Sequence, residues 1–172
     1  IARSTKLPLL LYSIPGRCGV EIAVDTVNRL AHDSVNIVGI KEASGNPDRV
    51  SQLRAALGPK FTILSGDDSL TLPFMAVGAQ GVISVASNVI PREVAHMVRA
   101  YSTGNLSLAL KLHDKFYPLF KDLFIETNPC PVKAALAMMG MLEEDLRLPL
   151  VRISAASREK LRKTLKACGV LK

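Results

Sequence analysis

The residue with the clearest chemical potential is Lys41, which ends the apolar run 35–40 and is followed by Glu42. The run is short, β-branched and free of charge, so it predicts a strand buried on both faces of a parallel sheet. Burial disfavours the charged form of an amine, and a neutral amine can add to a carbonyl carbon to form a Schiff base. The alternative is a lysine whose amine reaches past the strand end into solvent.

Four apolar runs, each predicted to be a strand, alternate with helical patterns. The strands are expected over 8–13, 35–41, 61–65 and 80–85, and the helices over 23–32, 47–57 and 68–77. Asn46 and Asp67 are the predicted N-caps of the second and third helices, and Pro73 interrupts the third. This β-α-β-α-β-α-β series predicts parallel strands joined by crossover helices.

The sequence after the fourth strand predicts only helices, over 91–103, from the cap Asn105 to about residue 125, over 131–139 and over 157–168. Four β/α units are half of an eight-stranded barrel of about 250 residues, and residues 2–6 resemble the tail of a helix. The expected fold class is therefore α/β: the second half of a (β/α)8 TIM barrel followed by a helical C-terminal region. We expect the four units in residues 1–90, and the last barrel helix and a helical domain in 91–172. A free-standing four-stranded α/β domain is the alternative.

Charge and hydropathy limit the partners of the chain. Its formal net charge is +7, and the positive excess lies mainly in residues 152–172. No nucleic-acid motif accompanies it, so it predicts the solvated face of a terminal helix and no nucleic-acid partner. No apolar run approaches about 18 residues and the N-terminus has no signal-peptide pattern. We therefore expect no membrane partner and a cytoplasmic location.

The other candidate ligands and nucleophiles have ordinary explanations. Cys18, Cys130 and Cys168 suit a reducing compartment and match neither a zinc nor a thioredoxin-type spacing. Asp67 and Asp68 fit helix capping better than metal binding. The three histidines show no triad or metal spacing. No metal site is expected.

Five segments together carry a family resemblance. They are Tyr-Ser-Ile-Pro-Gly-Arg at 12–17, Gly-Ile-Lys-Glu at 39–42, Ser-Gly-Asp-Asp at 65–68, Gly-Ala-Gln-Gly-Val-Ile-Ser-Val-Ala-Ser-Asn at 78–88 and Asn-Pro-Cys-Pro-Val-Lys at 128–133. In their order and spacing the chain resembles the dihydrodipicolinate synthase family. That family is part of the pyruvate-dependent class I aldolases, which include N-acetylneuraminate lyase. The resemblance covers essentially the whole chain.

The resemblance implies a role for each matching residue. Lys41 would form the Schiff base with pyruvate, and Tyr12 would relay protons. Arg17 would bind the carboxylate of aspartate semialdehyde, for which its planar fork is suited. Gly81 and Ile83 would bring backbone close to the lysine and the bound pyruvate. No cofactor is expected, because the covalent imine of pyruvate on Lys41 provides the chemistry. The resemblance places the reaction in lysine and diaminopimelate biosynthesis.

Some family features are absent from this sequence. Ser13 and Cys18 stand where Asn and Thr are more usual. The N-terminal half of the family's sequence has no match here. In the family that half carries a Thr-Thr pair, a second Tyr donated across a dimer interface and a lysine feedback site. We therefore expect a need for the missing N-terminal half, and a homo-oligomer such as the family dimer or tetramer.

Two other functions fit the same residues. One is a related pyruvate-dependent aldolase or dehydratase that uses another aldehyde. The other is a non-catalytic half-barrel that acts as an assembly or regulatory partner, with Lys41 kept for packing. Trapping with pyruvate and borohydride separates the second from the enzymes, and a comparison of aldehydes separates the enzymes from each other.

Overall fold

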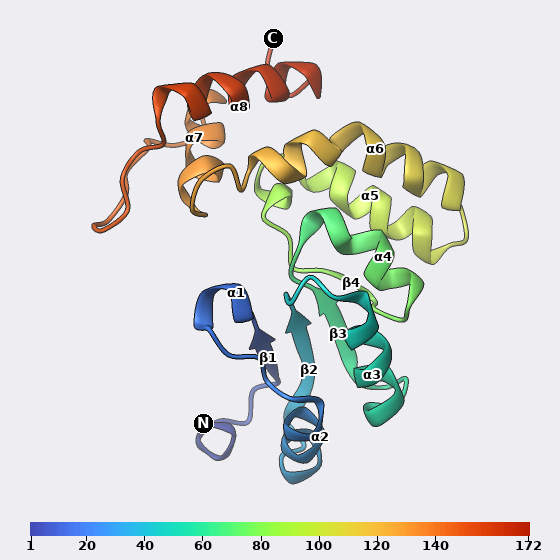
Figure 1. The fold of residues 1–172 in the computed structure, drawn as a ribbon. Helices are drawn as coiled ribbons and strands as arrows, with labels where there is room; N and C mark the ends of the chain where they lie inside the picture. The colour runs from blue at the N-terminus through green and yellow to red at the C-terminus, as the bar shows by residue number, and fades with distance from the viewer. The chain divides into compact units, whose positions relative to one another are not determined.

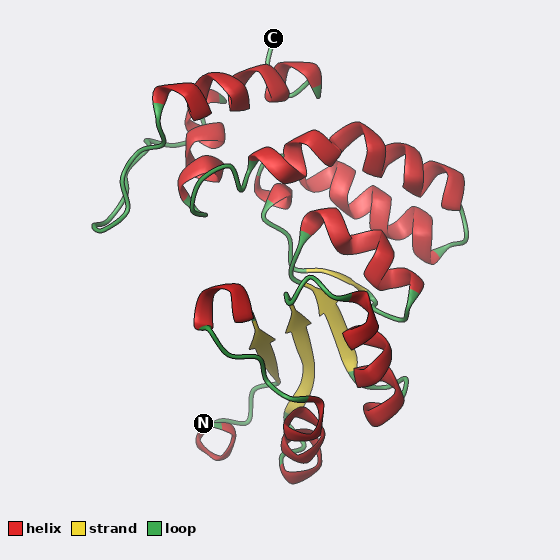
Figure 2. Cartoon of the chain, in the orientation of Figure 1, coloured by secondary structure: helices red, strands yellow, loops and turns green.

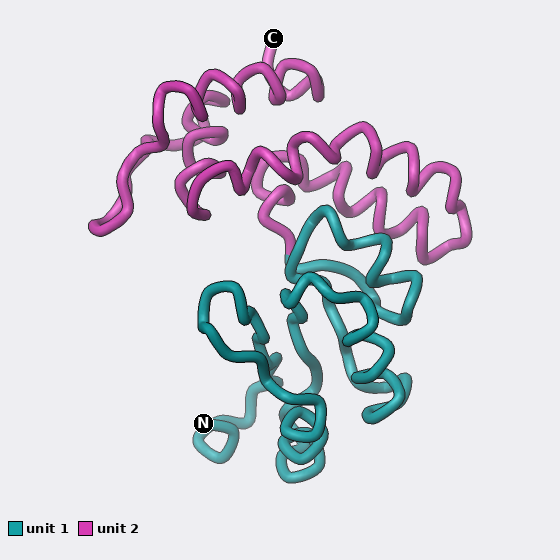
Figure 3. Tube along the Cα trace, in the orientation of Figure 1, with its two compact units in different colours: residues 1–83 teal, residues 84–172 magenta.

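A computed structural model describes residues 1–172, the whole of the sequence given. The chain divides into two compact units, residues 1–83 and residues 84–172 (Figure 3). All the strands lie in the first unit, and the second unit contains only helices and loops (Figure 2). None of the helices is both long and apolar enough to span a membrane.

The first unit contains a four-stranded parallel sheet (Figure 1). Its strands follow the chain order: β1 (Leu9–Ser13), β2 (Ile37–Glu42), β3 (Thr62–Ser65) and β4 (Gly81–Val82). The prediction of parallel strands is confirmed, but the fourth strand is much shorter than the expected 80–85. Ile83 still donates its backbone N–H to the Ser65 carbonyl at 2.9 Å. Ser84 then ends the strand, because its hydroxyl accepts from the Ser87 N–H at 2.7 Å and starts a turn.

The helical segments of the first unit are η1 (Ala2–Ser4), α1 (Pro15–Cys18), α2 (Val24–Asp33), α3 (Pro47–Leu57), η2 (Asp68–Leu70) and α4 (Thr71–Ala76). Two of them, α3 and η2, begin at the predicted caps. The Asn46 side chain accepts from Asp48 N at 3.0 Å, and the Asp67 side chain accepts from Ser69 N at 2.9 Å. Pro73 is tolerated because it lies in the first turn of α4, where its missing N–H has no helical partner.

One face of the sheet is packed against helices. Val27 of α2, Val50 and Leu53 of α3, and Ile40 and Ile63 of the sheet have no exposed surface. Full burial of each of these side chains contributes about 1.5–3 kcal/mol, which holds the helices on this face of the sheet.

The opposite face of the sheet is open. Leu10 and Tyr12 of β1 are 44% and 46% exposed, and Val38 of β2 is 38% exposed. The prediction that the run before Lys41 is buried on both faces is therefore wrong for this chain, because helices cover only one side of the sheet. Lys41 itself is half-buried.

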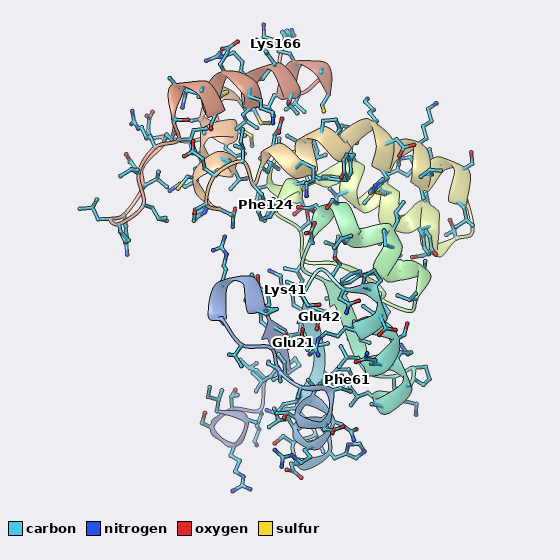
Figure 4. The ribbon with its side chains drawn as sticks, viewed as in Figure 1. Glu21, Lys41, Glu42, Phe61, Phe124 and Lys166 are labelled. Carbon is cyan, nitrogen blue, oxygen red and sulfur yellow. The ribbon has the colours of Figure 1, made fainter.

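The second unit is built from η3 (Ala86–Asn88), α5 (Pro91–Ser102), α6 (Leu106–Asp122), α7 (Cys130–Met138) and α8 (Ala155–Ala167). α8 buries Leu161 and Leu165 completely, while Lys160 and Lys166 are exposed, as expected for an amphipathic helix. Figure 4 labels Lys166 on this helix. Lys160 Nζ lies 3.0 Å from a carboxylate oxygen of buried Asp122, and this ion pair joins α8 to α6.

Candidate active site

Lys41 and Tyr12 are neighbours at the carboxyl end of the sheet. The register pairs Tyr12 of β1 with Lys41 of β2, and Lys41 with Leu64 of β3. Side chains at paired positions of adjacent strands point to the same face, so both project from the open face. Lys41 Nζ lies 4.1 Å from the centroid of the Tyr12 ring. The ring face therefore contacts the one amine in position to act as a nucleophile at this strand end.

Gly66, which follows β3, gives the Lys41 side chain its space. A Cβ atom built on Gly66 would lie 3.2 Å from Lys41 Cε and 2.6 Å from Ala43 Cβ. Ala43 Cβ has no rotamer that could move it away, so a larger residue at 66 would displace this part of the site. Gly66 belongs to the Ser-Gly-Asp-Asp motif of residues 65–68, but the motif alone does not assign it to the site. The available signal was a glycine that directly follows the strand next to the one that carries Lys41.

Gly81 and Ile83 lie further across the sheet. Gly81 pairs with Leu64, which in turn pairs with Lys41, so β3 separates Gly81 from the lysine. Two strand spacings place them about 10 Å apart. Ile83 directly follows β4, keeps a backbone hydrogen bond to Ser65 of β3 and is 37% exposed. The two residues are aligned with the site, and their role in binding stays a prediction.

Arg17 lies in α1, a single helical turn directly after β1. The Ile14 carbonyl accepts from the backbone N–H groups of Arg17 and Cys18, each at 3.0 Å. Gly19, with a φ of 69°, ends this turn in a left-handed conformation that suits glycine. The turn holds an exposed Arg17 at the same end of the sheet as Tyr12 and Lys41.

A buried ionic cluster lies behind the site, and sequence reasoning missed it. Glu42, the residue after Lys41, has no exposed surface, and Arg49 of α3 is 4% exposed. Arg49 Nε donates to Glu42 Oε2 at 2.7 Å, and Arg49 Nη1 donates to Glu21 Oε1 at 2.6 Å. Figure 4 labels Glu21 and Glu42, the two carboxylates that Arg49 joins. A glutamate at a strand end followed seven residues later by an arginine in a first helical turn was the only signal in the sequence.

Comparison with known proteins gives the family. The model of the dihydrodipicolinate synthetase family matches residues 1–168. The chain belongs to this family. The family resemblance inferred from the five motifs is thereby confirmed.

The similar proteins carry the same family name. The 4-hydroxy-tetrahydrodipicolinate synthase of Aquifex aeolicus is 51% identical over 166 residues, which are 96% of this chain and 56% of that protein. The solved structure of the Methylacidiphilum fumariolicum SolV enzyme is 60% identical, with a TM-score of 0.96, and the match covers 98% of this chain and 56% of that one.

A third member of the family was solved with a ligand. The chloride-inhibited dihydrodipicolinate synthase of Acinetobacter baumannii, complexed with pyruvate, is 40% identical with a TM-score of 0.94; the match covers 99% of this chain and 58% of that one. The chain therefore spans a little over half the length of the relatives it matches.

Proposed function

We propose that this chain supplies the lysine-bearing half of the active site of a 4-hydroxy-tetrahydrodipicolinate synthase, as the second half of a (β/α)8 barrel with its helical C-terminal region. The observation that carries the proposal is the Lys41 amine packed on the Tyr12 ring, at the carboxyl end of a parallel sheet. Barrel enzymes place their chemistry at this end of the strands. Family membership and the pyruvate complex of the A. baumannii relative support the assignment.

The proposed reaction begins with covalent capture of pyruvate. The neutral amine of Lys41 adds to the ketone carbon, water leaves, and a Schiff base forms. The imine nitrogen then draws electrons from the methyl carbon, which loses a proton and becomes an enamine carbon. That carbon attacks the aldehyde carbon of aspartate semialdehyde and forms the new carbon–carbon bond, while the aldehyde oxygen takes up a proton. The amino group from the semialdehyde then attacks the imine carbon, which closes the ring and releases the amine of Lys41.

The other site residues assist this sequence. Tyr12 is the proposed proton relay, a role that the family resemblance implies and that the contact of its ring with the Lys41 amine supports. Backbone near Gly81 and Ile83 is proposed to bind the pyruvate side of the site. The proposed chemistry uses no metal or organic cofactor. The complete site is proposed to need the half that longer relatives have in addition, within a homo-oligomer.

Gly66→Ala tests the position of the lysine. We expect it to slow borohydride-trapped pyruvate capture by about 10- to 100-fold, because displacement of a reacting group by about 1 Å has effects of that size. Gly16→Ala is the matched control, since a Cβ there would meet no atom within 4 Å. Equal capture rates in the two variants would show that Gly66 does not set the position of Lys41.

Arg17→Ala tests the choice of aldehyde. In the protein complemented with the missing half, the KM for aspartate semialdehyde should rise about 10- to 150-fold, because a charge-assisted contact of about 1.5–3 kcal/mol is lost. The KM for pyruvate should change little. Steady-state condensation assays with both substrates varied measure the difference.

Arg29→Ala removes another exposed arginine, on α2, and serves as the control. An equal rise in both KM values for Arg17→Ala would count against a role in binding the semialdehyde carboxylate. A faster reaction with an aldehyde that lacks this carboxylate would favour the related aldolases instead.

A further inference from the structure

The guanidinium of Arg49 donates in three directions to two different parts of the first unit. Nε reaches Glu42 on β2 at 2.7 Å, and Nη1 reaches Glu21 at 2.6 Å. Nη2 donates to the backbone carbonyl of Ile22. Glu42 belongs to the strand that carries Lys41, whereas Glu21 and Ile22 belong to the segment between α1 and α2. One buried side chain therefore joins these two segments.

Glu21 and Ile22 lie at the end of the loop that carries Arg17. This loop, residues 14–21, leaves β1 after Ser13 and returns to it at Ile22, whose backbone N–H donates to the Ser13 hydroxyl at 3.4 Å. That return contact is long for a hydrogen bond and weak on its own. The stronger attachment of the returning chain is the charge-assisted pair of Arg49 with Glu21, together with the contact to Ile22 O.

The rest of the cluster fixes Arg49 to the strand end. Glu42 Oε1 accepts from the backbone N–H of Ser44 at 2.8 Å, so each oxygen of this buried carboxylate has a donor. Glu42 is adjacent to Lys41, and successive side chains of a strand point to opposite faces. The ionic cluster thus holds the covered face of the strand end, directly behind the lysine on the open face.

We propose that Arg49 is a positioning residue that holds the Arg17 loop at a fixed place relative to Lys41. The kinetic part of this inference rests on the proposed function, because it takes Arg17 as the group that binds the aldehyde substrate. A lysine in place of Arg49 could keep the buried charge next to Glu42. It could not also reach Glu21 and Ile22, because it lacks the planar fork.

Glu21→Ala and Arg49→Lys are the informative variants. Glu21 is 42% exposed, so its removal leaves the buried Glu42–Arg49 pair intact and the fold preserved. Arg49→Lys keeps the buried charge. Asp33→Ala removes an exposed carboxylate at the end of α2 and is the control.

Cys18 provides a probe of the loop that does not depend on activity. It is the exposed cysteine, next to Arg17, while Cys130 and Cys168 are buried. A nitroxide attached to Cys18 in the whole chain, joined by its complementary half where the preparation requires it, reports the mobility of the loop. We expect narrower electron paramagnetic resonance lines in Glu21→Ala and Arg49→Lys, and unchanged lines in Asp33→Ala. Unchanged lines in the first two variants would overturn the proposal.

Kinetics of the complemented protein supply the second measurement. Loss of one ordering contact should raise the KM for aspartate semialdehyde by about 2- to 10-fold in Glu21→Ala, with pyruvate capture at Lys41 unchanged. An equal effect on both substrates would overturn selective positioning. If the unmodified protein captures no pyruvate, the proposed function fails, and the nitroxide spectra still decide whether Arg49 holds the loop.

Discussion

Lys41→Met is expected to eliminate covalent capture of pyruvate and to lower condensation by at least about 10³-fold, as removal of a catalytic nucleophile does in other enzymes. Methionine has a similar length and no nucleophilic nitrogen. Because Lys41 is only half-buried and has its amine against the Tyr12 ring, the sheet should tolerate the change. Treatment of the complemented protein with pyruvate and borohydride, followed by peptide mass mapping, measures the capture.

Lys60→Met is the control for this substitution. Lys60 is exposed between α3 and β3, away from the carboxyl end of the sheet, and its loss should change neither capture nor turnover. A label on any other lysine of the unmodified chain would contradict the assignment of Lys41. Undiminished capture in Lys41→Met would contradict it equally.

The strand pattern and the caps were predictable because they depend on local sequence. Asn46 and Asp67 accept the hydrogen bonds expected of N-caps, and the apolar runs form the expected parallel sheet. The meeting of Tyr12 and Lys41 also followed from strand order, because residues at the carboxyl ends of consecutive parallel strands share an edge. That Tyr12 and Lys41 are directly paired in the sheet could be learned only from the structure, because the two sequences do not determine the register of their strands.

The buried cluster could not be found by local reasoning. Charged residues at a strand end and in a first helical turn are normally solvated, so the spacing of Glu42 and Arg49 alone does not predict that they are buried. Their burial depends on the way α3 folds back over the covered face of the sheet. Gly66 was missed for a related reason: its function is to leave space for Lys41, and space is a property of the packed structure.

The sequence also indicated more burial than the structure contains. The runs that form β1 and β2 are apolar on both faces, but Leu10, Tyr12 and Val38 remain substantially exposed. Such a pattern is typical of strands covered on both sides. The difference identifies the open sheet face as a surface that needs cover, and the greater length of the relatives is consistent with a further half that provides it.

We therefore expect the 172-residue chain by itself to self-associate and to have negligible condensation activity. β1 and β4 each have a partner on one side only, and unpaired strand edges next to exposed apolar side chains promote association. Full burial of an exposed apolar side chain contributes about 1.5–3 kcal/mol, and Leu10 is 44% exposed, so its burial on association contributes somewhat under half of that amount. Several such side chains together favour association. Light scattering and a condensation assay on the purified chain, with and without the complementary half, measure both effects.

A charged residue on the open face should distinguish association through this face from non-specific hydrophobic association. Leu10→Glu should reduce self-association, because burial of its carboxylate between two apolar faces is unfavourable. Leu148→Glu changes an apolar side chain of the second unit that is 87% exposed, and it should leave association through the sheet unaffected. If the unmodified chain is a stable, monodisperse monomer with turnover close to that of a full-length relative, the open face needs no partner and the half-barrel proposal is wrong.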